Sequence, residues 1–287
     1  MTRLLESHIQ ETLAFLADID EMLMARVRNG LRGVALHAIG VAENEPPPVP
    51  VERVTVVPIT AGEGIIPGFA EAVSAIARHL GFDAEVASGA DVSGIAEAYV
   101  NGGDIMLLAD EFRFVAVNLR TGAVADNDRA TGEGFAALLE MMAGGLRGRP
   151  CGVIGCGPVG TAAAMRLARH GAKLTVCDLD ETRGRGLATR IQAEIAGAVS
   201  WVDNVADLMK VSRYIVDAAP AGGIIAADAV RPDMFITAPG VPLGLTSDAM
   251  ELMGSRIYHD NLPLGVATML MAAAHGRMIV EGMPRGA

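Results

Sequence analysis

The first residues of the chain carry an apolar periodicity that is typical of an amphipathic helix. Between residues 4 and 27, leucine, isoleucine and valine recur mostly three or four positions apart, which predicts one long helix. Asn29-Gly30 would end it, because both residues tolerate the left-handed backbone conformation. A second short apolar segment follows, and the proline-rich residues 43–50 then predict an exposed connector. The pattern therefore predicts a helical start that precedes the first strand.

From residue 53 to residue 148, strand-like and helix-like patterns alternate. Apolar and β-branched runs predict strands at 54–59, 83–87, 104–109 and 112–119. Apolar positions at helical spacing, with glycines near the helix ends, predict helices at about 67–80, 91–101 and 132–143. Strands that alternate with helices in this way indicate an α/β domain.

A second α/β pattern begins after a boundary at 147–150. Its predicted strands are 151–155, 172–178, 201–202, 214–218 and 234–238, and its first helix is 158–170. A last helix, at 264–280, is expected to pack back onto the first domain. The predicted fold class is α/β with two domains: an N-terminal α/β domain at 1–148, a C-terminal Rossmann-like doubly wound domain at 149–275, and a tail at 276–287; the motifs below give the first the substrate and the second the dinucleotide.

Composition narrows the classes of function. The chain has 287 residues, of which 51% are hydrophobic, so it can bury a core and is not intrinsically disordered. A net charge of −11 argues against nucleic acid or an anionic membrane as the main partner. An aromatic content of 4% argues against a surface that stacks bases. The first residues lack the apolar core of a secretory signal, so we expect a cytoplasmic location.

The cysteines are few and lie close together in the sequence. Cys151, Cys156 and Cys177 are an odd number in a cysteine-poor chain, which fits a reducing compartment. No histidine or acid stands at ligand spacing from them. We therefore expect buried small side chains and no metal site.

A G-x-G-x-x-G motif occupies residues 155–160. It follows a predicted strand, opens a predicted helix and precedes a second strand that ends in Asp178, as in dinucleotide-binding domains. Gly155 permits the tight turn, Gly157 lets a pyrophosphate approach the backbone, and Gly160 lets the helix lie against the sheet. Unpaired N–H groups at the helix start favour phosphate. The predicted cofactor-binding residues of this region are Gly155, Cys156, Gly157, Pro158, Val159, Gly160, Asp178 and Leu179.

The predicted cofactor is NAD. The Asp178 carboxylate would accept a hydrogen bond from the ribose 2′-hydroxyl and would repel a 2′-phosphate. Arg183 and Arg185 could serve a 2′-phosphate, but we prefer to interpret them as solvated helix charges. Two later strand ends, in the segments 218–220 and 238–242, lie where the nicotinamide and its ribose are expected. They add Ala219, Pro220 and Pro239 to the predicted cofactor-binding residues, although ordinary turn chemistry explains each of these residues about equally well.

Two loops of the first domain are candidates for binding the substrate. The loop at 60–64 offers backbone N–H groups and the Thr60 hydroxyl before a helix, which suits a substrate carboxylate, although an ordinary loop without a ligand explains it equally well. Asp110 directly follows an apolar strand, where a carboxylate could hold a substrate ammonium or take its proton. A solvated acid is the alternative, and it is favoured for Glu111. The sequence shows no zinc-binding histidine pattern and no G-x-S-x-G, which leaves hydride transfer.

A further group of motifs extends over both domains. They are VPITAGEGII (57–66), GFD (81–83), ADVSGIAEAYVNGG (90–103), MLLADE (106–111), NLRTG (118–122), TG (131–132), GVIGCGPVG (152–160) and TAPGVP (237–242). Over roughly residues 50 to 275, the chain resembles the PylD family, whose members catalyse the last step of pyrrolysine biosynthesis. The motifs of the N-terminal half are far more diagnostic of this family than the shared nucleotide fingerprint.

The resemblance implies a specific reaction. The family uses NAD+ to oxidise the terminal amine carbon of L-lysine-Nε-(3R)-methyl-D-ornithine to a semialdehyde or imine. The ornithine α-amine then attacks, and loss of water or ammonia closes the pyrroline ring of pyrrolysine. The resemblance assigns Asp110 to the reacting amine, and it implies substrate contacts from Thr60, Ala61, Gly62, Asn118 and Asp260. Ala61 departs from the pattern, because some members have a serine there.

Two other classes of function stay open. A shikimate-dehydrogenase-like or imine-reductase-type oxidoreductase would share the plan, although the first domain shows no Lys–Asp catalytic pair. A non-catalytic NAD-sensing protein would not need acidic residues in the loops of the first domain. The expected partner is a small-molecule substrate, and the frequency of twofold assemblies favours a homodimer.

Overall fold

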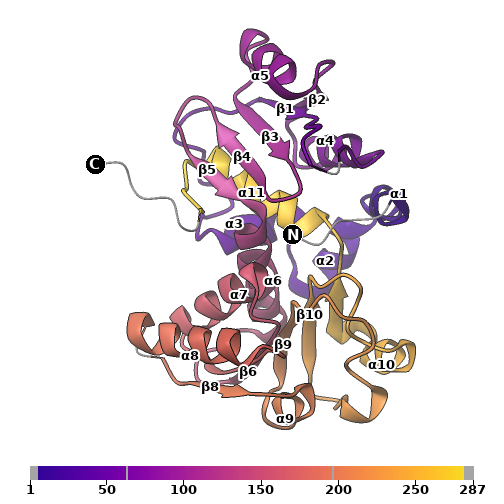
Figure 1. Ribbon diagram of the computed structural model, residues 1–287, viewed down its shortest axis with the longest axis vertical. Coiled ribbons are helices and arrows are strands. Elements are labelled where there is room, and N and C mark those ends of the chain that lie inside the picture. The colour runs from indigo at the N-terminus through magenta and orange to yellow at the C-terminus, as the bar shows by residue number, and fades with distance from the viewer. Residues whose placement is uncertain (1–5, 63, 196, 281–287) are drawn as a thin grey trace. The chain divides into compact units, whose positions relative to one another are not determined.

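The structure, a computed structural model, describes residues 6–62, 64–195 and 197–280 (Figure 1). Contacts divide the chain into two compact units: unit 1 is residues 1–130 and 262–287, and unit 2 is residues 131–261. These units are defined by contacts, whereas the domains predicted at 1–148 and 149–275 are defined by the sequence pattern, and their bounds stay a prediction. The end of the predicted tail, residues 281–287, lies outside the described residues.

Unit 1 begins with helices α1 (Glu6–Phe15), α2 (Ile19–Val27) and α3 (Leu31–Ala38). The prediction of one helix over 4–27 is therefore wrong, and its first two residues lie outside the described part of the chain. The Asp18 N–H donates to the Phe15 carbonyl only three residues back, at 3.1 Å, and this tighter turn separates α1 from α2. Leu16 and Ile19 are buried on either side of the turn, so the apolar periodicity continues through it and conceals it.

The sheet of unit 1 has the strand order β2-β1-β3-β4-β5. Its strands are β1 (Arg53–Val57), β2 (Asp83–Val86), β3 (Ile105–Ala109), β4 (Phe114–Asn118) and β5 (Val124–Asp126). β1 pairs in parallel with β2 and β3, whereas β3–β4 and β4–β5 are antiparallel pairs. Two helices, α4 (Phe69–His79) and α5 (Asp91–Val100), make the parallel crossovers. Because such crossovers are right-handed, α4 and α5 cover opposite faces of the sheet.

The strand predicted at 112–119 is shorter in the structure and forms a hairpin with β3. It begins at Phe114, because the Asp110 N–H donates to the Arg113 carbonyl at 2.8 Å and the residues between them form the turn. β5 has only three residues and was not predicted. Strands β3, β4 and β5 thus form a β-meander at one side of the sheet, where the sequence predicted a single strand after β3.

Helix α6 (Asn127–Ala143) begins earlier than the predicted start at residue 132. The carboxylate of Asp126 accepts hydrogen bonds from the N–H groups of Asp128 (3.0 Å) and Arg129 (3.3 Å). These bonds satisfy two N–H groups of the first helical turn, as an N-cap does. The added turn contains no apolar periodicity, which is why the sequence pattern missed it.

The last helix, α11 (Pro263–Ala274), belongs to unit 1. All of its residues are buried, and it packs against α3, α4, β4 and β5. The predicted helical end at residue 280 is wrong, because Ile279 instead pairs with β5: its carbonyl accepts from Asp126 (2.8 Å) and its N–H donates to Val124 (3.0 Å). Even this most apolar helix is too short to cross a membrane, and no other helix within the described ranges can do so.

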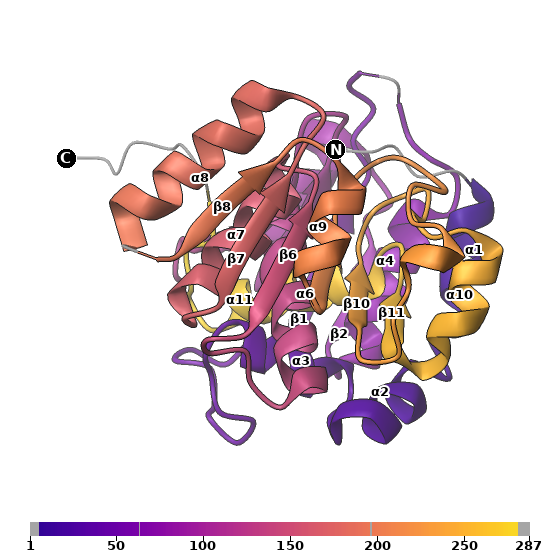
Figure 2. The same ribbon diagram turned by 90° about the horizontal axis from the view of Figure 1, so that it is seen from below.

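Unit 2 contains a parallel sheet with the order β11-β10-β9-β6-β7-β8 (Figure 2). Its strands are β6 (Pro150–Ile154), β7 (Lys173–Cys177), β8 (Val199–Val202), β9 (Tyr214–Asp217), β10 (Phe235–Ala238) and β11 (Ile257–His259). Its connecting helices include α7 (Pro158–Arg169), α8 (Glu181–Ile195), α9 (Val205–Val211) and α10 (Ser247–Met253). The strand order reverses between β6 and β9, which is the doubly wound arrangement predicted from the sequence.

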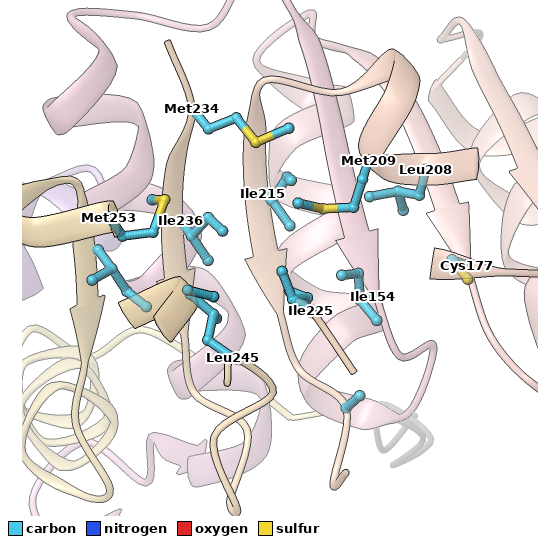
Figure 3. Close-up of a cluster of buried hydrophobic side chains, with 13 residues drawn as sticks. Ile154, Cys177, Leu208, Met209, Ile215, Ile225, Met234, Ile236, Leu245 and Met253 are labelled. Carbon is cyan, nitrogen blue, oxygen red and sulfur yellow. The ribbon is translucent and has the colours of Figure 1, made fainter. Parts of the chain in front are cut away.

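One face of this sheet carries a tightly packed apolar cluster (Figure 3). Ile154, Ile215 and Ile236 project from three neighbouring strands, and Leu208 of α9 and Met253 of α10 pack over them. All five are less than 3% exposed. The cluster holds the strands in register, so the loops at their carboxyl ends start from fixed positions.

Candidate functional site

The glycine loop of unit 2 has the geometry that the motif predicts. Gly155 has a positive φ of 86°, and a Cβ at Gly160 would lie 1.8 Å from the Gly155 carbonyl oxygen. Neither position therefore accepts another side chain without strain. Gly157 differs, because a Cβ there would meet no heavy atom within 4 Å. The loop thus closes tightly on itself and leaves open space only beside its middle glycine.

Helix α7 starts directly at this loop. Gly157 is its N-cap residue with an extended backbone, and Pro158 occupies the first helical turn, where its missing N–H costs nothing. The Thr161 N–H donates to the Gly157 carbonyl at 2.8 Å. The N–H groups of the preceding turn have no carbonyl partner within the helix, so the helix start can bind an anion.

Asp178 lies against the same loop. Its Oδ2 accepts a hydrogen bond from the Cys156 N–H at 2.6 Å, and its Oδ1 accepts one from the Asp180 N–H at 2.8 Å. The strand end and the glycine loop, which are separated in sequence, are thereby joined by the acid that the sequence singled out. Leu179, the next residue, is 94% exposed.

The two arginines that could have bound a 2′-phosphate are engaged with neighbours. Arg183 pairs with Asp180 at 3.4 Å, and Arg185 pairs with Glu181 while its guanidinium lies 4.5 Å from the ring centre of Trp201. Both arginines are more than 60% exposed, so these pairs contribute little to stability. They do show that each arginine already has an acidic neighbour on α8 or at its start.

Loops that follow three different strands meet at their backbones. A Cβ at Gly155 would come 2.9 Å from the backbone of Ala218 and Ala219, and a Cβ at Gly240 would come 2.4 Å from the Ala219 carbonyl oxygen. The Gly240 N–H also donates to the main-chain carbonyl of Asp217 at 3.1 Å. The structure therefore brings the predicted cofactor residues of β6 and β9 together. The two remaining predicted residues, Pro220 and Pro239, adjoin these loops in the chain.

Two ionisable residues at this edge were not predicted from the sequence. Asp217 ends β9 with no exposed surface, and burial raises its pKa to about 7. His259 ends β11, and its Nδ1 lies 2.7 Å from the Ala238 carbonyl oxygen. Because a carbonyl oxygen can only accept, Nδ1 carries the proton of this hydrogen bond. The acid at the end of an apolar strand was the available signal for Asp217.

The thiols of unit 2 are buried and free. Burial is the main reason that the pKa of Cys151 and of Cys156 is raised to about 12 and that of Cys177 to about 11. The negative charge of Asp178 adds to the shift of Cys156 and Cys177. The three side chains stay protonated near neutral pH and act as small apolar groups, as expected.

In unit 1, the loop that follows β1 holds a carboxylate of its own chain. The Thr60 N–H donates to Oδ1 of Asp91 at 2.8 Å, and the Thr60 hydroxyl donates to Oδ2. These two bonds lower the pKa of Asp91, which has a left-handed backbone (φ 52°) at the start of α5. The loop does bind an anion, but the groups predicted to hold a substrate carboxylate are already used. Glu63 of this loop lies outside the described residues, and Ala61 is exposed.

Asp110 and Gly62 lie at the carboxyl edge of the same sheet. Oδ1 of Asp110 accepts from the N–H groups of Phe112 (2.8 Å) and Arg113 (2.7 Å), which fixes the turn into β4. Its Oδ2 has no partner within the described ranges and is the oxygen open to a ligand. A Cβ at Gly62 would come 2.5 Å from the Glu111 carboxyl carbon, so the two loops approach each other closely.

Asn118 lies at the opposite edge of the sheet, because β4 is antiparallel to β3 and Asn118 pairs with Ile105. It is fully buried; its amide nitrogen donates to the Ala273 carbonyl at 2.9 Å, and its amide oxygen accepts from the N–H groups of Arg120 and Thr121. The structure therefore does not bring Asn118 together with Asp110, and its amide is used to join β4 to α11.

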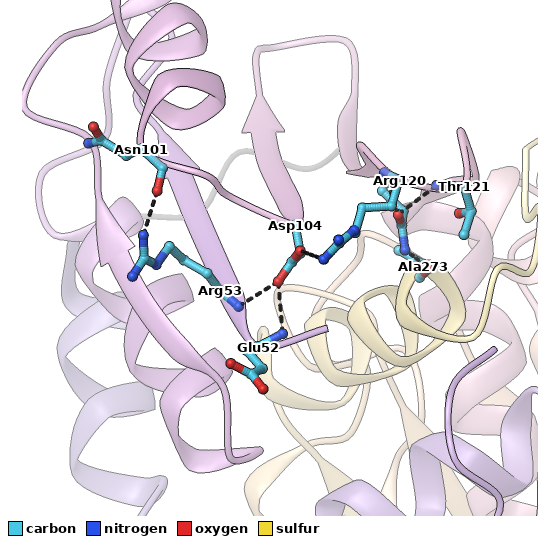
Figure 4. Close-up of polar contacts among 8 residues, drawn as sticks. Glu52, Arg53, Asn101, Asp104, Arg120, Thr121 and Ala273 are labelled. Carbon is cyan, nitrogen blue, oxygen red and sulfur yellow. Dashed lines mark hydrogen bonds and ion pairs between the residues drawn. The ribbon is translucent and has the colours of Figure 1, made fainter. Parts of the chain in front are cut away.

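A polar network occupies the same edge as Asn118 (Figure 4). Oδ2 of Asp104 accepts from the N–H groups of Glu52 (2.9 Å) and Arg53 (3.1 Å), and Oδ1 accepts from Nη1 of Arg120 at 2.9 Å. Burial alone would raise the pKa of Asp104, but these donors outweigh it and hold the pKa below its usual value. The network is structural, since it ties the entries of β1 and β3 to the turn after β4.

Asp260 follows β11 in unit 2 and is buried. Its Oδ2 accepts a hydrogen bond from the Tyr258 hydroxyl at 2.5 Å. The Tyr258 ring itself packs against Phe135 of α6, with 5.8 Å between the ring centres. The predicted substrate acid is thus held by a buried tyrosine, a partner that could not be read from the sequence.

Comparison with known proteins identifies relatives of this chain. Residues 8–125 match the family described as "Pyrrolysine biosynthesis protein PylD, N-terminal domain". Over 219 residues, the chain is 31% identical to the pyrrolysine synthase of Methanosarcina barkeri, covering 76% of this chain and 80% of that protein. It is 29% identical to the pyrrolysine synthase of Methanosarcina acetivorans, again over 76% of this chain and 81% of the relative.

Solved structures share the fold at much lower identity. Quinate dehydrogenase from Corynebacterium glutamicum, in complex with NAD, is similar with a TM-score of 0.55 at 18% identity, over 79% of this chain and 93% of the other. Shikimate dehydrogenase from Aquifex aeolicus has a TM-score of 0.55 at 15% identity, over 80% and 94%. These likenesses support the two-domain α/β fold class.

Proposed function

Because the chain belongs to the PylD family of pyrrolysine synthases, we propose that it is an NAD-dependent dehydrogenase that forms L-pyrrolysine. Its substrate is L-lysine-Nε-(3R)-methyl-D-ornithine, whose terminal amine carbon it oxidises to an imine or semialdehyde. The observation that carries the proposal is the match of the N-terminal domain, which is specific to this family, whereas the glycine motif is common to many dehydrogenases. The acidic, cysteine-poor composition supports a cytoplasmic enzyme, and we propose a homodimer on the frequency of such assemblies.

Residues of unit 2 fit a bound dinucleotide. The space beside Gly157 is open for a pyrophosphate, while Gly155 and Gly160 allow the backbone to close around it. Asp178 supports NAD over NADP, because its carboxylate can accept from a ribose hydroxyl and would repel a phosphate. The acidic neighbours of Arg183 and Arg185 support the same choice. When bound, NAD+ supplies the hydride acceptor.

Asp110 is the residue that we assign to the reacting amine. Its Oδ1 is held by two backbone N–H groups, so the carboxylate cannot rotate freely and its Oδ2 keeps one direction. That oxygen can bind the substrate ammonium and accept one of its protons. A neutral amine is required, because its lone pair must form the new C=N bond as hydride leaves the adjacent carbon.

Oxidation of the amine and closure of the ring need no co-reactant other than NAD+ and water. Loss of one proton from nitrogen and of hydride from carbon converts C–N into C=N. The ornithine α-amine can attack this carbon directly and expel ammonia. Alternatively, water adds first and releases ammonia to give the semialdehyde, and the α-amine then condenses with loss of water. Both routes close the same five-membered ring.

A shikimate-dehydrogenase type of reaction is the main rival. That reaction needs a Lys–Asp pair in the substrate domain, and this chain has no lysine before Lys173. The similar solved structures are below 20% identical and share the fold only. No observation on this chain favours the rival over pyrrolysine formation.

The test uses purified protein with NAD+ and the lysyl-methylornithine. We expect NADH absorbance and a product with the mass of pyrrolysine, and a lower rate with NADP+. Asp110→Asn should reduce kcat by at least about a hundredfold, because the amide keeps the turn-forming acceptor but cannot take a proton. Glu111→Gln, in the exposed neighbour, is the control and should keep the rate. If the protein binds NAD+ but forms no NADH with this substrate, the proposed function is wrong.

A further inference from the structure

Asp217 is a buried acid to which the proposed reaction gives no role. It ends β9, the strand beside the one that carries the glycine loop, and none of its surface is exposed. Its Oδ1 accepts from the Ala219 N–H at 3.3 Å, whereas its Oδ2 is buried without a hydrogen-bond partner of acceptable geometry among the described residues. An ionised oxygen in such a place is costly, because burial removes it from bulk water and no described donor reaches it with good geometry.

The carboxyl group lies where the loops that follow β9 and β10 converge. A Cβ at Gly244 would come 2.0 Å from Oδ2, so the loop after β10 closes directly over this oxygen. That loop is fixed from the other side by the bond from Ile225 N–H to the Gly244 carbonyl, at 2.9 Å. The loop after β9 reaches Oδ1 through Ala219, and Gly240 bonds the Asp217 main chain. The charge of this one side chain therefore acts on both loops.

The surroundings of Asp217 favour its neutral form. Burial raises its pKa to about 7, against an opposing effect of the backbone N–H groups of Ala219 and Gly244. No charged side chain of the described part of the chain contributes to this shift. The flanking loops at 218–225 and 239–246 contain no ionisable residue. The ionisable groups on the strands and in the glycine loop are Cys151 on β6, Cys156 in the loop, Tyr214 on β9, and Tyr258 and His259 on β11. Those on the neighbouring helices are Arg166 and Arg169 on α7, which pair with Glu133 and Glu140, Asp207 and Lys210 on α9, which pair with each other, and Asp248 and Glu251 on α10.

We propose that Asp217 is a positioning residue for cofactor binding, whose carboxyl group must be protonated for the loops at 218–220 and 239–245 to hold the shape that receives the nicotinamide end of NAD+. When the proton is lost, the new charge must be hydrated, and Gly244 lies directly over the charged oxygen. Movement of the loop at 239–245 is the direct way to admit water. The inference rests on the proposed function, because it needs these loops to contact the cofactor.

The test is the dissociation constant of NAD+ between pH 5.5 and 8.5, measured by calorimetry on the full chain. For the wild-type protein we expect affinity to fall about tenfold from pH 6 to pH 8, since binding would require a group that titrates near 7 to be protonated. Asp217→Asn should bind with an affinity that does not change with pH, because the amide is neutral throughout and has nearly the same shape. Asp228→Asn, at an exposed acid of the same unit, should follow the wild-type curve.

The outcomes separate this inference from the proposed function. If the wild-type protein binds NAD+ equally at pH 6 and pH 8, or if Asp217→Asn keeps the wild-type pH dependence, Asp217 does not have this role. If the wild-type protein binds no NAD+ at any pH, the proposed function itself fails. Carbon-13 NMR of the wild-type carboxyl groups answers the question even if the variant does not fold. An aspartate that titrates near pH 7, and whose titration moves upward with saturating NAD+, supports the role, and the absence of such a group overturns it.

Discussion

At the scale of single residues, two glycines of one loop have opposite environments. A Cβ at Gly160 would lie 1.8 Å from the Gly155 carbonyl oxygen, whereas a Cβ at Gly157 would meet nothing within 4 Å. Gly160→Ala should therefore lower the free energy of unfolding by about 2 kcal/mol through overpacking. Gly157→Ala should cost no more than about 1 kcal/mol, the difference between the two residues at an N-cap.

Gly157→Ala should weaken binding of the cofactor without unfolding the protein. Gly157→Ala should keep its fold yet bind NAD+ at least about tenfold more weakly, because the methyl group occupies the space that we assign to pyrophosphate. Urea unfolding and NAD+ titration of the same samples give both quantities. A Gly157→Ala protein with wild-type NAD+ affinity would contradict the assignment of this loop.

The aspartates show how far environment decides the behaviour of one residue type. The folded pKa of Asp104 is lowered, so its contribution to stability is present above the ordinary aspartate pKa and is lost as pH falls through the folded value. Asp217 has the opposite sign. Its folded pKa, about 7, lies above the unfolded one, so its protonated form favours folding at acid pH and that contribution is lost as pH rises toward 7.

At the scale of elements, Asp104 connects the starts of β1 and β3. Its carboxylate accepts two backbone N–H groups and the Arg120 guanidinium. Asp104→Ala should therefore destabilise unit 1 by about 2 kcal/mol at neutral pH, because hydrogen bonds to a charged group are lost together. The free energy of unfolding from urea titration, with a probe in unit 1, measures the effect.

Asp83→Ala provides the matched control for Asp104. Asp83 also pairs with Arg53, at 3.7 Å, but both side chains are about half or more exposed. Its removal should change stability by less than about 0.5 kcal/mol. Equal effects of the two substitutions would show that the Asp104 network does not stabilise the sheet.

The sequence predicted those elements whose cause is local. Strand β1 is rich in β-branched residues and β3 is a continuous apolar run. Helix α7 follows a glycine loop and has a proline in its first turn and a periodic apolar face. Pairing decided the others: β11 has three residues and is a strand only because it lies beside β10, where Ile257 pairs in parallel with Ile236. The break between α1 and α2 was hidden, because its flanking apolar positions keep helical spacing.

In the candidate site too, the sequence predicted the features that depend on neighbouring residues and missed those that depend on contacts between distant ones. The loop at 155–160 is defined by its own backbone, so its glycines revealed it. The partner of Thr60 is Asp91, which lies a full strand and helix further along the chain, and only the folded sheet brings them together. Asp217 and Asn118 depend on burial and on strand direction in the same way. The role of a residue that contacts a partner far away in the sequence could not be assigned from motif spacing.

At the scale of the whole molecule, unit 1 is built from both ends of the chain. Residues 131–261 form unit 2 between them, and α11 returns to unit 1 with every residue buried. Its contacts reach α3, α4 and the last two strands of the sheet. Unit 1 therefore cannot complete its core until α11 is present, although most of its elements come first in sequence.

A chain that ends at Asn261 should consequently keep only unit 2 folded. Loss of α11 exposes an apolar surface whose burial exceeds the marginal stability of a domain, so limited proteolysis should digest residues 1–130 and leave a resistant fragment that starts near residue 131. In the full chain, Leu270→Ala on α11 should cost about 3 kcal/mol, whereas Leu252→Ala, 55% exposed on α10, should cost less than about 0.5 kcal/mol. If the truncated chain resists proteolysis over both units, α11 covers the core of unit 1 without being needed for it to fold.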